Sequence, residues 1–600
     1  MTEQTETTLT RGEPPVGNLS GFKTYLKHDI VSGFLVFLIA LPLCLGISLS
    51  YGFPAIAGVF TAIIGAIVTT FISNSELTIK GPAAGLIAIV APCVMSFGWS
   101  GVAGEFNLEA YRCALAVGVA AGVIQILMGI FRVGSLGDFF PSSVVHGMLA
   151  AIGVIILAKM LPAALGVKVG GAPLDLLLGL PTILQHYEPT IAIVGLVSVS
   201  IMFAWPFIQK KFVKVKAIPA AMIVLAVAIP LANVLDLSSK HTNAVSLDSK
   251  KPTAAVASAA ADKQPATADH AAADAKPAAP AKSDTLISVP AFGETFSSLT
   301  FPKFDALLQP QAWQWVFMFA IIGTLESMLS AKAMDLIDPW KRKTTLDRDN
   351  IAVGVANTLC AFVGATPMIS EIVRSRANLD NGARTRFADM WHGVFLLAFV
   401  SLLPFVITMI PVAALMAMLV YTGFRLAHPK EFAHVYHIGA GQLVVYCATM
   451  IGCVAIDLLA GVAIGIVVKL IIHVLGGAPV GSLFKTSVNV VNSGDTTVLH
   501  VSRSAVFSNW LGLKKRILQA ATGDQVIVDL SETRLVDHTV MSNLAQLKSE
   551  FTALQCELVI RGLDDHQAVS QDIAAARRKR SIEAGGRSRQ DANPGRSSSV

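Results

Sequence analysis

The stretch Ala361–Thr385, AFVGATPMISEIVRSRANLDNGART, starts apolar, is interrupted at Gly364–Pro367 and ends in charged residues. Proline suits the first turn of a helix because it has no N–H group to leave unpaired. We therefore predict a helix that begins at Pro367 or Met368 and is about half a membrane span long. Its first amides have no partner within the helix and carry the positive end of the helix dipole, so they favour an anion.

An earlier stretch has the same design. Residues Ser73–Lys80 are polar, and Gly81–Gly85 (GPAAG) opens a short apolar run that ends at Phe97. Apolar segments interrupted by Gly or Pro in corresponding halves of a chain point to the binding site of a transporter. The two interruptions therefore predict the substrate-binding residues, which are Ala83, Ala84 and Gly85 in the first half and Met368, Ile369, Ser370 and Arg374 in the second.

The composition excludes an ordinary soluble protein. Of 600 residues, 53% are hydrophobic and 14% charged, and the mean hydropathy is +0.62. Apolar runs of roughly 20 residues, the length that crosses a bilayer core, recur along the chain. We therefore predict a polytopic α-helical protein embedded in the lipid bilayer. Residues 1–28 are polar and lack the apolar core of a signal peptide, which predicts a cytoplasmic N-terminal segment, with an interfacial helix at Asn18–Ile30.

We find no motif typical of metal binding, nucleic-acid binding or enzymatic catalysis in the sequence. The seven cysteines stand singly, without a metal-binding spacing, and we interpret them as small buried apolar residues. The net charge of +6 is modest, and no basic patch interleaved with aromatic residues suggests nucleic acid. The chain also lacks a nucleophile elbow and a phosphate loop. We therefore expect no enzyme and no cofactor, apart from a coupling proton or sodium ion.

Apolar runs predict seven spans in each half of the chain. The first set is Asp29–Ser50, Pro54–Ser73, Ala83–Phe97, Glu109–Phe131, Ser142–Leu161, Pro189–Ile208 and Ile218–Leu235. The second set is Gln311–Ala331, Asn350–Val363, Met368–Ala377, Met390–Met409, Val412–Ala427, Gly441–Ile456 and Asp457–Gly476. Together they form a predicted transport domain over residues 29–476.

The distribution of basic residues predicts the orientation of these spans. With the N-terminus in the cytoplasm, the inside loops carry Lys80, Arg132, Lys210, Lys211, Lys214, Lys216, Lys341, Arg342, Lys343, Arg348, Arg376, Arg384, Arg386, Arg425 and Lys430. This satisfies the positive-inside rule and predicts cytoplasmic termini in an inner (plasma) membrane. An odd number of spans per half makes the second half inverted. The two broken helices, third in each half, then point their N-termini at each other near the midplane.

Two further regions differ in composition from the spans. Residues 238–301 are rich in Ala, Lys, Pro and Asp, and we predict a disordered outer loop there. After Gly476 the periodicity predicts strands at Thr496–Val501, Gln525–Asp529 and Glu557–Ile560 and helices at Leu511–Ala521 and Val540–Leu554. We therefore predict a small cytoplasmic α/β domain over residues 486–570, followed by a disordered basic tail over residues 571–600.

Several motifs resemble, in order, those of the sulfate permease (SulP) family of inorganic-anion transporters. They are Asp29–Gly33 with Leu41–Pro42, Thr78–Gly85 (TIKGPAAG), Gly323–Ala331 (GTLESMLSA), Arg374–Thr385, and a STAS-like unit centred on Asp529–Ser531 and Asp537–Thr539. The resemblance implies inverted seven-span repeats, an anion held between spans three and ten, and a homodimer. Serine follows the aspartate of the last motif in phospho-switch STAS domains, but His538 stands there, so we expect a structural or dimer-facing role.

Three charged residues are the sharpest site candidates. Arg374 lies within a short apolar helix, where a cation costs roughly 2.5–3.5 kcal/mol, so it either coordinates the anion or snorkels to the cytoplasmic face. Glu326 lies in the eighth span without a basic neighbour, so it can take up a proton, or it is a structural carboxylate. Glu371 either occupies the anion seat itself, pairs with Arg374 at i,i+3, or accepts a proton with the substrate.

Hydroxyl groups complete the predicted site. Thr324 is grouped with Glu326 and Glu371 as a ligand of the coupling ion, and Ser370 and Thr366 are possible donors to the substrate or helix caps. The leading hypothesis is a secondary transporter of sulfate or bicarbonate, coupled to protons or sodium. A passive channel or exchanger for chloride or small dicarboxylates, and a membrane regulator centred on the STAS-like unit, are the alternatives.

Deleting Lys251–Ser283 is expected to leave transport and folding nearly unchanged, because the segment has no aromatic residue with which to pack. Uptake and the yield of folded protein after size-exclusion chromatography provide the measurement. A large loss of folded protein would show that the segment packs on the outer face.

Overall fold

The computed structural model describes residues 14–103, 105–212, 215, 218–246, 255–256, 285–290, 299–493, 495–521, 525–553 and 556–579. These divide into two compact units. The first comprises Met1–Ala433 and Leu443–Val468, and the second comprises His434–Gln442 and Lys469–Val600. The second unit therefore includes the junction of two helices from the apolar part of the chain and extends beyond the predicted domain at residues 486–570.

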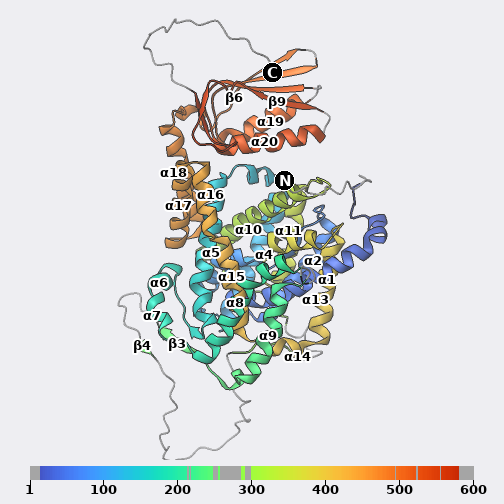
Figure 1. Ribbon diagram of the computed structural model, residues 1–600, viewed down its shortest axis with the longest axis vertical. Helices are drawn as coiled ribbons and strands as arrows, with labels where there is room; N and C mark the ends of the chain where they lie inside the picture. Colours follow the sequence, from blue (N-terminus) through green and yellow to red (C-terminus); the bar gives the residue numbers. More distant parts are fainter. Residues whose placement is uncertain are drawn as a thin grey trace, which may run out of the picture. The chain divides into compact units, whose positions relative to one another are not determined.

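Helices build the apolar part of the chain (Figure 1). They are α1 (Leu19–Ser50), α2 (Ala55–Ile72), α3 (Ile87–Ser96), α4 (Leu108–Ile130), α5 (Ser142–Ala164), α6 (Pro173–Leu178), α7 (Leu180–Leu184), α8 (Pro189–Lys211), α9 (Ala220–Val234), α10 (Pro310–Ile337), α11 (Leu346–Phe362), α12 (Ile372–Asp380), α13 (Phe387–Leu402), α14 (Pro404–Thr408), α15 (Val412–Leu426), α16 (Pro429–Ile438), α17 (Ala440–Ala455) and α18 (Leu458–Leu475).

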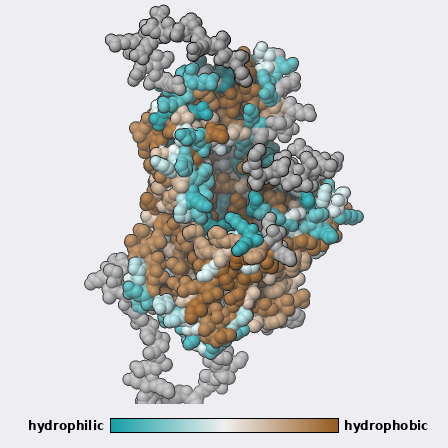
Figure 2. Space-filling view, viewed as in Figure 1, coloured by the Kyte–Doolittle hydropathy of each residue, from teal (hydrophilic) through white to brown (hydrophobic). Residues whose placement is uncertain are grey.

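In the described part of the chain, eight helices are long and apolar enough to cross a membrane, and four shorter apolar helices accompany them. Figure 2 shows broad hydrophobic areas on the face drawn, as expected for helices that lie against lipid. Every predicted span coincides with at least part of a helix. The protein is therefore a multi-pass membrane protein.

The beginning of α1 and the fourth span of the second half differ from the predictions. Helix α1 is continuous from Leu19, so residues 19–28 belong to it and form no separate interfacial helix. Asn18 caps it by accepting a 2.7 Å hydrogen bond from the Gly21 amide. The predicted span Met390–Met409 is divided into α13 and α14, because Pro404 cannot donate the hydrogen bond that a continuous helix requires.

The two interrupted segments meet as a pair of strands, which the sequence did not predict. Strand β1 (Ile79–Gly81) pairs antiparallel with β5 (Ile369–Glu371), with Lys80 opposite Ser370. Helix α12 therefore begins at Ile372 and not at Pro367 or Met368. In the first half, a 3₁₀ turn, η1 (Ala84–Leu86), leads from β1 into α3. Pairing satisfies backbone groups that would otherwise be buried without partners.

The predicted outer loop at residues 238–301 has ordered ends. Strand β3 (Asn243–Ser246) joins β2 (Val167–Lys168) and β4 (Ala255–Val256) in a small sheet. Near the other end, Thr285 is buried and its hydroxyl donates to the Leu237 carbonyl. The prediction of disorder is wrong for these residues, and the deletion of Lys251–Ser283 considered above would remove β4 from this sheet. Disorder stays a prediction for residues 247–254, 257–284 and 291–298, which lie outside the described part.

A mixed sheet forms the centre of the second unit, as the sequence predicted for a small α/β domain. Its strands are β6 (Ser487–Ser493), β7 (Thr496–Ala505), β8 (Gln525–Val536), β9 (Glu557–Arg561), β10 (His566–Ala568) and β11 (Arg577–Lys579). Strands β7, β8 and β9 run parallel, and β6 and β11 pair antiparallel at the sides. Helices α19 (Trp510–Ala520) and α20 (His538–Ala553) bury Trp510, Leu513 and Phe551 against this sheet.

The basic tail begins later than predicted. Arg577–Lys579 form β11, which pairs with β10 and β8, so the prediction of disorder from residue 571 is wrong for these residues. Residues 580–600 lie outside the described part. Strands β6, β10 and β11 were not predicted, because β6 is largely exposed and the other two are very short.

Asp537 fixes the start of α20. Its Oδ1 accepts a 2.8 Å hydrogen bond from the Val540 amide, and its Oδ2 accepts one of 3.2 Å from Phe507. Burial alone would raise the pKa of this carboxyl group. The contact with His473, the charge of Lys469 and the hydrogen bond from the Val540 amide outweigh it, so the pKa of Asp537 lies below its ordinary value. The charged form is therefore the one that stabilises the fold.

Asp537→Ala is expected to destabilise α20 by about 0.5–2 kcal/mol at neutral pH, the usual effect of losing an N-cap. Because the folded-state pKa is depressed, this stabilisation is fully present above the unfolded value of about 3.9 and is lost only as the pH falls through the folded value. Hydrogen exchange of α20 peptides, compared with wild type at each pH, measures it. Equal protection at pH 7 would contradict the assignment.

Candidate functional site

Arg374 lies in the first turn of α12 and is buried, with 1% of its surface exposed. Its Nη2 donates to the Pro82 carbonyl just after β1, and its Nη1 lies 3.5 Å from the Sγ of Cys44 on α1. Its Nε finds no hydrogen-bond partner in the described chain. The snorkelling interpretation is therefore wrong, because the guanidinium group reaches across the core to the other broken segment.

Glu371 caps the same helix. Its carboxylate accepts a 3.4 Å hydrogen bond from the Arg374 amide, and its Oε2 lies 3.8 Å from Arg374 Nε. The i,i+3 pairing anticipated from the sequence is confirmed. The N-terminus of α12, which attracts negative charge, thus holds a carboxylate of the protein itself.

Glu326 lies on α10 with 5% of its surface exposed. It packs against Gly85 so closely that a Cβ atom there would lie 2.5 Å from Glu326 Oε1. That oxygen accepts no hydrogen bond from any described residue, and the charge of Glu371 reaches this carboxylate. A buried acceptor without a partner is costly, so this position favours a bound proton or cation.

Tyr51 belongs to the same neighbourhood and was not found from the sequence. The buried hydroxyl donates a 2.5 Å hydrogen bond to the Ala83 carbonyl, at the point where η1 begins. Ala84 and Gly85 open the 3₁₀ turn, so their amides have no acceptor within it. An aromatic residue at the end of an apolar span has no sequence signal that separates it from a packing residue.

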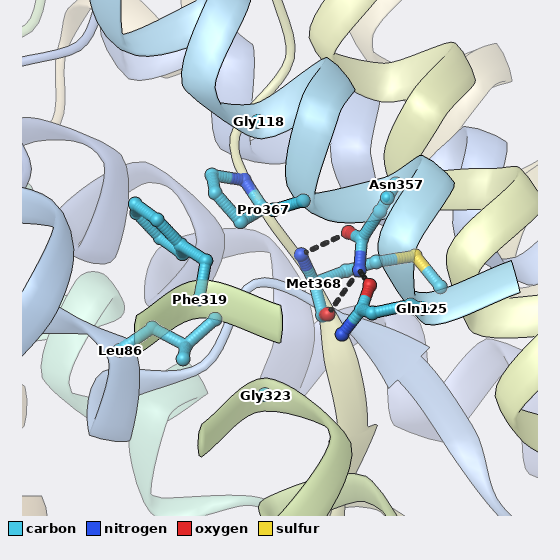
Figure 3. A pocket seen from close by; sticks show the side chains of 10 residues that line it. Leu86, Gly118, Gln125, Phe319, Gly323, Asn357, Pro367 and Met368 are labelled. Atoms are coloured by element: carbon cyan, nitrogen blue, oxygen red, sulfur yellow. Dashed lines mark hydrogen bonds between the residues drawn. The ribbon is translucent and has the colours of Figure 1, made fainter. Parts of the chain in front are cut away.

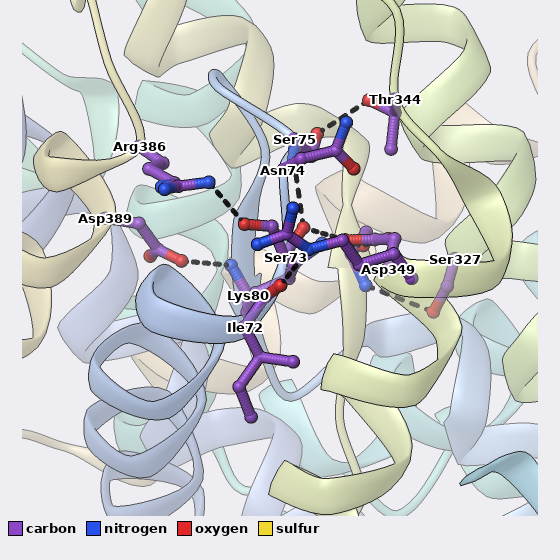
Figure 4. Close-up of polar contacts among 12 residues, drawn as sticks. Ile72, Ser73, Asn74, Ser75, Lys80, Ser327, Thr344, Asp349, Arg386 and Asp389 are labelled. Atoms are coloured by element: carbon purple, nitrogen blue, oxygen red, sulfur yellow. Dashed lines mark hydrogen bonds and ion pairs between the residues drawn. The ribbon is translucent and has the colours of Figure 1, made fainter. Parts of the chain in front are cut away.

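Lys80 is the largest departure from the sequence interpretation, which counted it as a loop cation. It is buried in β1, and its Nζ lies 2.7 Å from Asp349 Oδ1 and 2.5 Å from Ser370 Oγ (Figure 4). Ser73 also donates to Asp349, at 2.5 Å, and the Lys80 amide donates to Asp389 at 3.2 Å. A buried ion pair with further hydrogen bonds thus joins β1, β5 and α11.

The predicted site residues Met368, Ile369 and Ser370 anchor β5 and the residue before it. Ser370 directs its hydroxyl toward Lys80 and Asp349, and its amide donates to Ser327 at 3.3 Å. Both backbone groups of Met368 bond the side-chain amide of Asn357, at 2.8 and 3.1 Å (Figure 3). Ile369 is buried and pairs with Gly81. These residues hold β5 in place, and their polar groups do not turn toward Arg374.

The cavity in Figure 3 lies beside this anchor. It is lined by Leu86, Phe319, Met368 and small residues of α4, and its polar side chains, Gln125 and Asn357, hydrogen-bond each other at 2.8 Å. Its enclosed space holds little more than a water molecule, which is far less than a ligand site needs. We interpret it as a packing gap behind β5.

The predicted hydroxyl donors are also engaged elsewhere. Thr324 Oγ1 donates to Asn350 at 3.0 Å and accepts from Gln125 at 3.4 Å. The Thr366 hydroxyl lies 2.8 Å from that of Thr61. The structure therefore brings Arg374, Glu371, Glu326 and Gly85 together, and places Thr324 and Thr366 in separate contacts. Over the described ranges, no group of three or more His, Cys, Asp or Glu side chains could hold a metal ion.

The arrangement defines a class of protein: a multi-pass helical transporter in which two strands lead into two short helices at a buried charged site. The profile of the Sulfate permease family matches residues 26–449, and the chain belongs to that family. It is 23% identical to the "Putative sulfate transporter YvdB" of Bacillus subtilis over 76% of both chains. It is 20% identical to the "Bicarbonate transporter BicA" of Picosynechococcus over 79% of this chain and 74% of that protein.

Two solved structures share the fold. The transmembrane domain of a cyanobacterial bicarbonate transporter, BicA, superimposes with a TM-score of 0.56 and 17% identity, over 73% of this chain and 97% of that one. SLC26A9 superimposes with a TM-score of 0.62 and 14% identity, over 90% of this chain and 85% of that one. At these identities the likeness supports the fold alone.

The Lys80–Asp349 pair is expected to be structural. Removing one partner of a buried pair typically costs about 3–5 kcal/mol, whereas neutralising both is far milder. Lys80→Met should therefore lower the thermal stability of the detergent-solubilised protein strongly, and Lys80→Met/Asp349→Asn should recover much of it. Lys23→Met, on the exposed start of α1, is the matched control. A Lys80→Met variant as stable as wild type would contradict this role.

Proposed function

We propose that the protein is a secondary active transporter of a small inorganic anion, with protons as the coupling ion. One observation carries the proposal. At the junction of the two broken segments, the Nε of buried Arg374 lies 3.8 Å from Glu371 and has no hydrogen-bond partner among the described residues. One oxygen of a buried carboxylate, Glu326, accepts no hydrogen bond from those residues either.

The charges at this junction link anion binding to proton uptake. With both carboxylates ionised, Arg374 is outnumbered, and an incoming anion meets net negative charge. One bound proton makes the cluster neutral, and a second leaves the arginine to face the anion. In a low-dielectric interior these differences are large, so the anion and the proton stabilise each other. A passive channel requires no such titratable pair.

The membrane potential makes coupling to a cation necessary for anion uptake. A potential of 100 mV, negative inside, opposes entry by about 2.3 kcal/mol for each negative charge. A divalent anion therefore needs two compensating cations or exchange for another anion. Glu326 and Glu371 are suitably placed to carry two protons.

Sulfate and bicarbonate are the substrates that we propose, in that order. Relatives of the chain are named as transporters of these anions. Sodium coupling is the second candidate, because an unpaired carboxylate oxygen such as Glu326 Oε1 also suits a hard cation. Exchange of chloride or small dicarboxylates, and a purely regulatory role, account less well for two neighbouring acids at the junction, one of them buried.

The remaining architecture is part of the proposal. We infer fourteen spans as two inverted seven-span repeats in a plasma membrane, with both termini cytoplasmic, a homodimeric assembly and a STAS-like second unit. Strand β1 lies just before the third predicted span of the first half of the chain, and β5 lies at the start of the third predicted span of the second half. Their antiparallel pairing supports the inversion of the two halves. The mixed sheet with α19 and α20 supports the STAS-like assignment.

Arg374→Ala should abolish uptake while expression and assembly stay near normal, since the variant removes the only cation we place at the anion seat. We expect anion affinity to fall at least about tenfold, the effect of losing one strong charge-assisted contact. Arg374→Gln fills more of the vacated space and should behave alike. Arg376→Ala, two residues on and exposed, is the control. Transport with unchanged affinity by both Arg374 variants would show that the site lies elsewhere.

Glu326→Gln should mimic the protonated carboxylate. Substrate binding should survive and lose the part of its pH dependence between about pH 5 and 8 that Glu326 contributes, whereas wild type should bind more tightly as the pH falls. Accumulation against a gradient in proteoliposomes should fail. Calorimetry with and without sodium separates the coupling ions, because an amide is a poorer ligand for sodium. A mutant that still concentrates the anion as well as wild type would make Glu326 structural.

A further inference from the structure

The second unit contains a cavity of its own, which encloses about 520 Å³ between its atoms where it opens to solvent. Its wall is formed by the junction of α16 and α17, the end of α18, the end of β8 and the β10–β11 hairpin. The polar side chains that line it are Gln442, Lys469, His473, Asp537 and Arg578. All of these residues belong to the second unit.

Lys469 is the notable member of this lining. It is 1% exposed, and its Nζ donates a 2.7 Å hydrogen bond to the neutral amide oxygen of Gln442. Within the described residues, no carboxylate lies within 4 Å of that ammonium group. Buried charges are normally paired, because removing an ion from water is costly unless an opposite charge compensates it. The charge of Asp537 acts on this ammonium group without direct contact. The free space beside Lys469 is where an anion in direct contact fits.

The one carboxylate in the lining is already occupied. Asp537 accepts hydrogen bonds from the amides of Val540 and Phe507, which tie it to the start of α20. Its Oδ2 lies 3.4 Å from Nε2 of His473. His473 is 3% exposed, and its Nδ1 is without a hydrogen-bond partner among the described residues. The lining thus offers donors beyond those that the fold uses.

We propose that this cavity binds a phosphate group. The ammonium group of Lys469, the guanidinium group of Arg578, the imidazole of His473 and the amide of Gln442 line it together. Arginine is especially suited to the oxygens of phosphate. The remaining wall is apolar and includes Ile472, Leu535 and Val569, which leaves room for an organic remainder. The same chemistry is offered by a free phosphate or phosphate ester and by a phospholipid head group. The site is separate from Arg374 and goes beyond the proposed transport function.

The test uses the purified full-length protein in neutral detergent and inorganic phosphate as the probe, with binding measured by equilibrium dialysis of radiolabelled phosphate. Lys469→Gln and Arg578→Gln should each weaken binding about tenfold, as expected for the loss of one charge-assisted contact. Arg578 is exposed, so its replacement does not threaten the fold. Arg516→Gln, an exposed arginine on α19 outside the lining, should bind as wild type does.

Two further arms assign the site and the source. Arg374→Ala must retain phosphate binding, which separates this cavity from the transport site even if the proposed function fails. The second arm measures phosphate binding to wild type in nanodiscs with and without phosphatidic acid. If phosphatidic acid abolishes the binding, the occupant is the lipid head group. If phosphate binds equally well in its presence, the occupant is a free phosphate or phosphate ester. The proposal is overturned if wild type binds no phosphate without lipid, or if Lys469→Gln and Arg578→Gln both bind it as wild type does.

Discussion

The antiparallel pairing of β1 with β5 is the contact on which the rest of the site depends. These short strands come from opposite halves of the chain, and their register places Lys80 opposite Ser370 and Ile79 opposite Glu371. On one side, Lys80 and Ser370 join Asp349 in a buried ion pair. Beyond the strand ends, Arg374 reaches the carbonyl of Pro82. Because backbone groups buried in an apolar environment need partners, this pairing supplies a reason for two helices to be broken at the same place.

The charges fall into a structural set and a set available for chemistry. Lys80 and Asp349 satisfy each other, and Ser73 and Ser370 complete their hydrogen bonds. Arg374 and Glu326, by contrast, each keep a buried polar atom that has no hydrogen-bond partner among the described residues. A transporter must exchange partners as it works, so its working groups cannot be fully satisfied by the fold in any one state. The unpaired atoms of Arg374 and Glu326 are therefore the positions where an anion and a proton would complete the hydrogen bonding.

Much of this fold could be predicted from the sequence, and the site only in part. Long apolar runs identified the helices because their length and composition are set by the bilayer. Arg374, Glu326 and Glu371 stood out because ionisable residues in such runs are rare. The strand at Ile369–Glu371 could not be recognised, since three residues carry no periodicity and the partner strand lies in the other half of the chain. Lys80 was wrongly predicted to be a cation of an inside loop, because its partner, Asp349, is distant in the sequence and resembles an ordinary acidic residue in the first turn of a helix.

The central claim is that anion binding takes up protons at the junction of the two broken segments. It is tested most directly by counting protons bound per anion. Titration calorimetry of sulfate or bicarbonate binding, repeated at one pH in buffers of different ionisation enthalpy, gives that number as the slope of the observed enthalpy. Bicarbonate data must be corrected for its own protonation. From the charges of Arg374, Glu371 and Glu326, we predict uptake of about one proton for each monovalent anion and up to two for a divalent one. A slope of zero for anions that the protein binds and transports would contradict it.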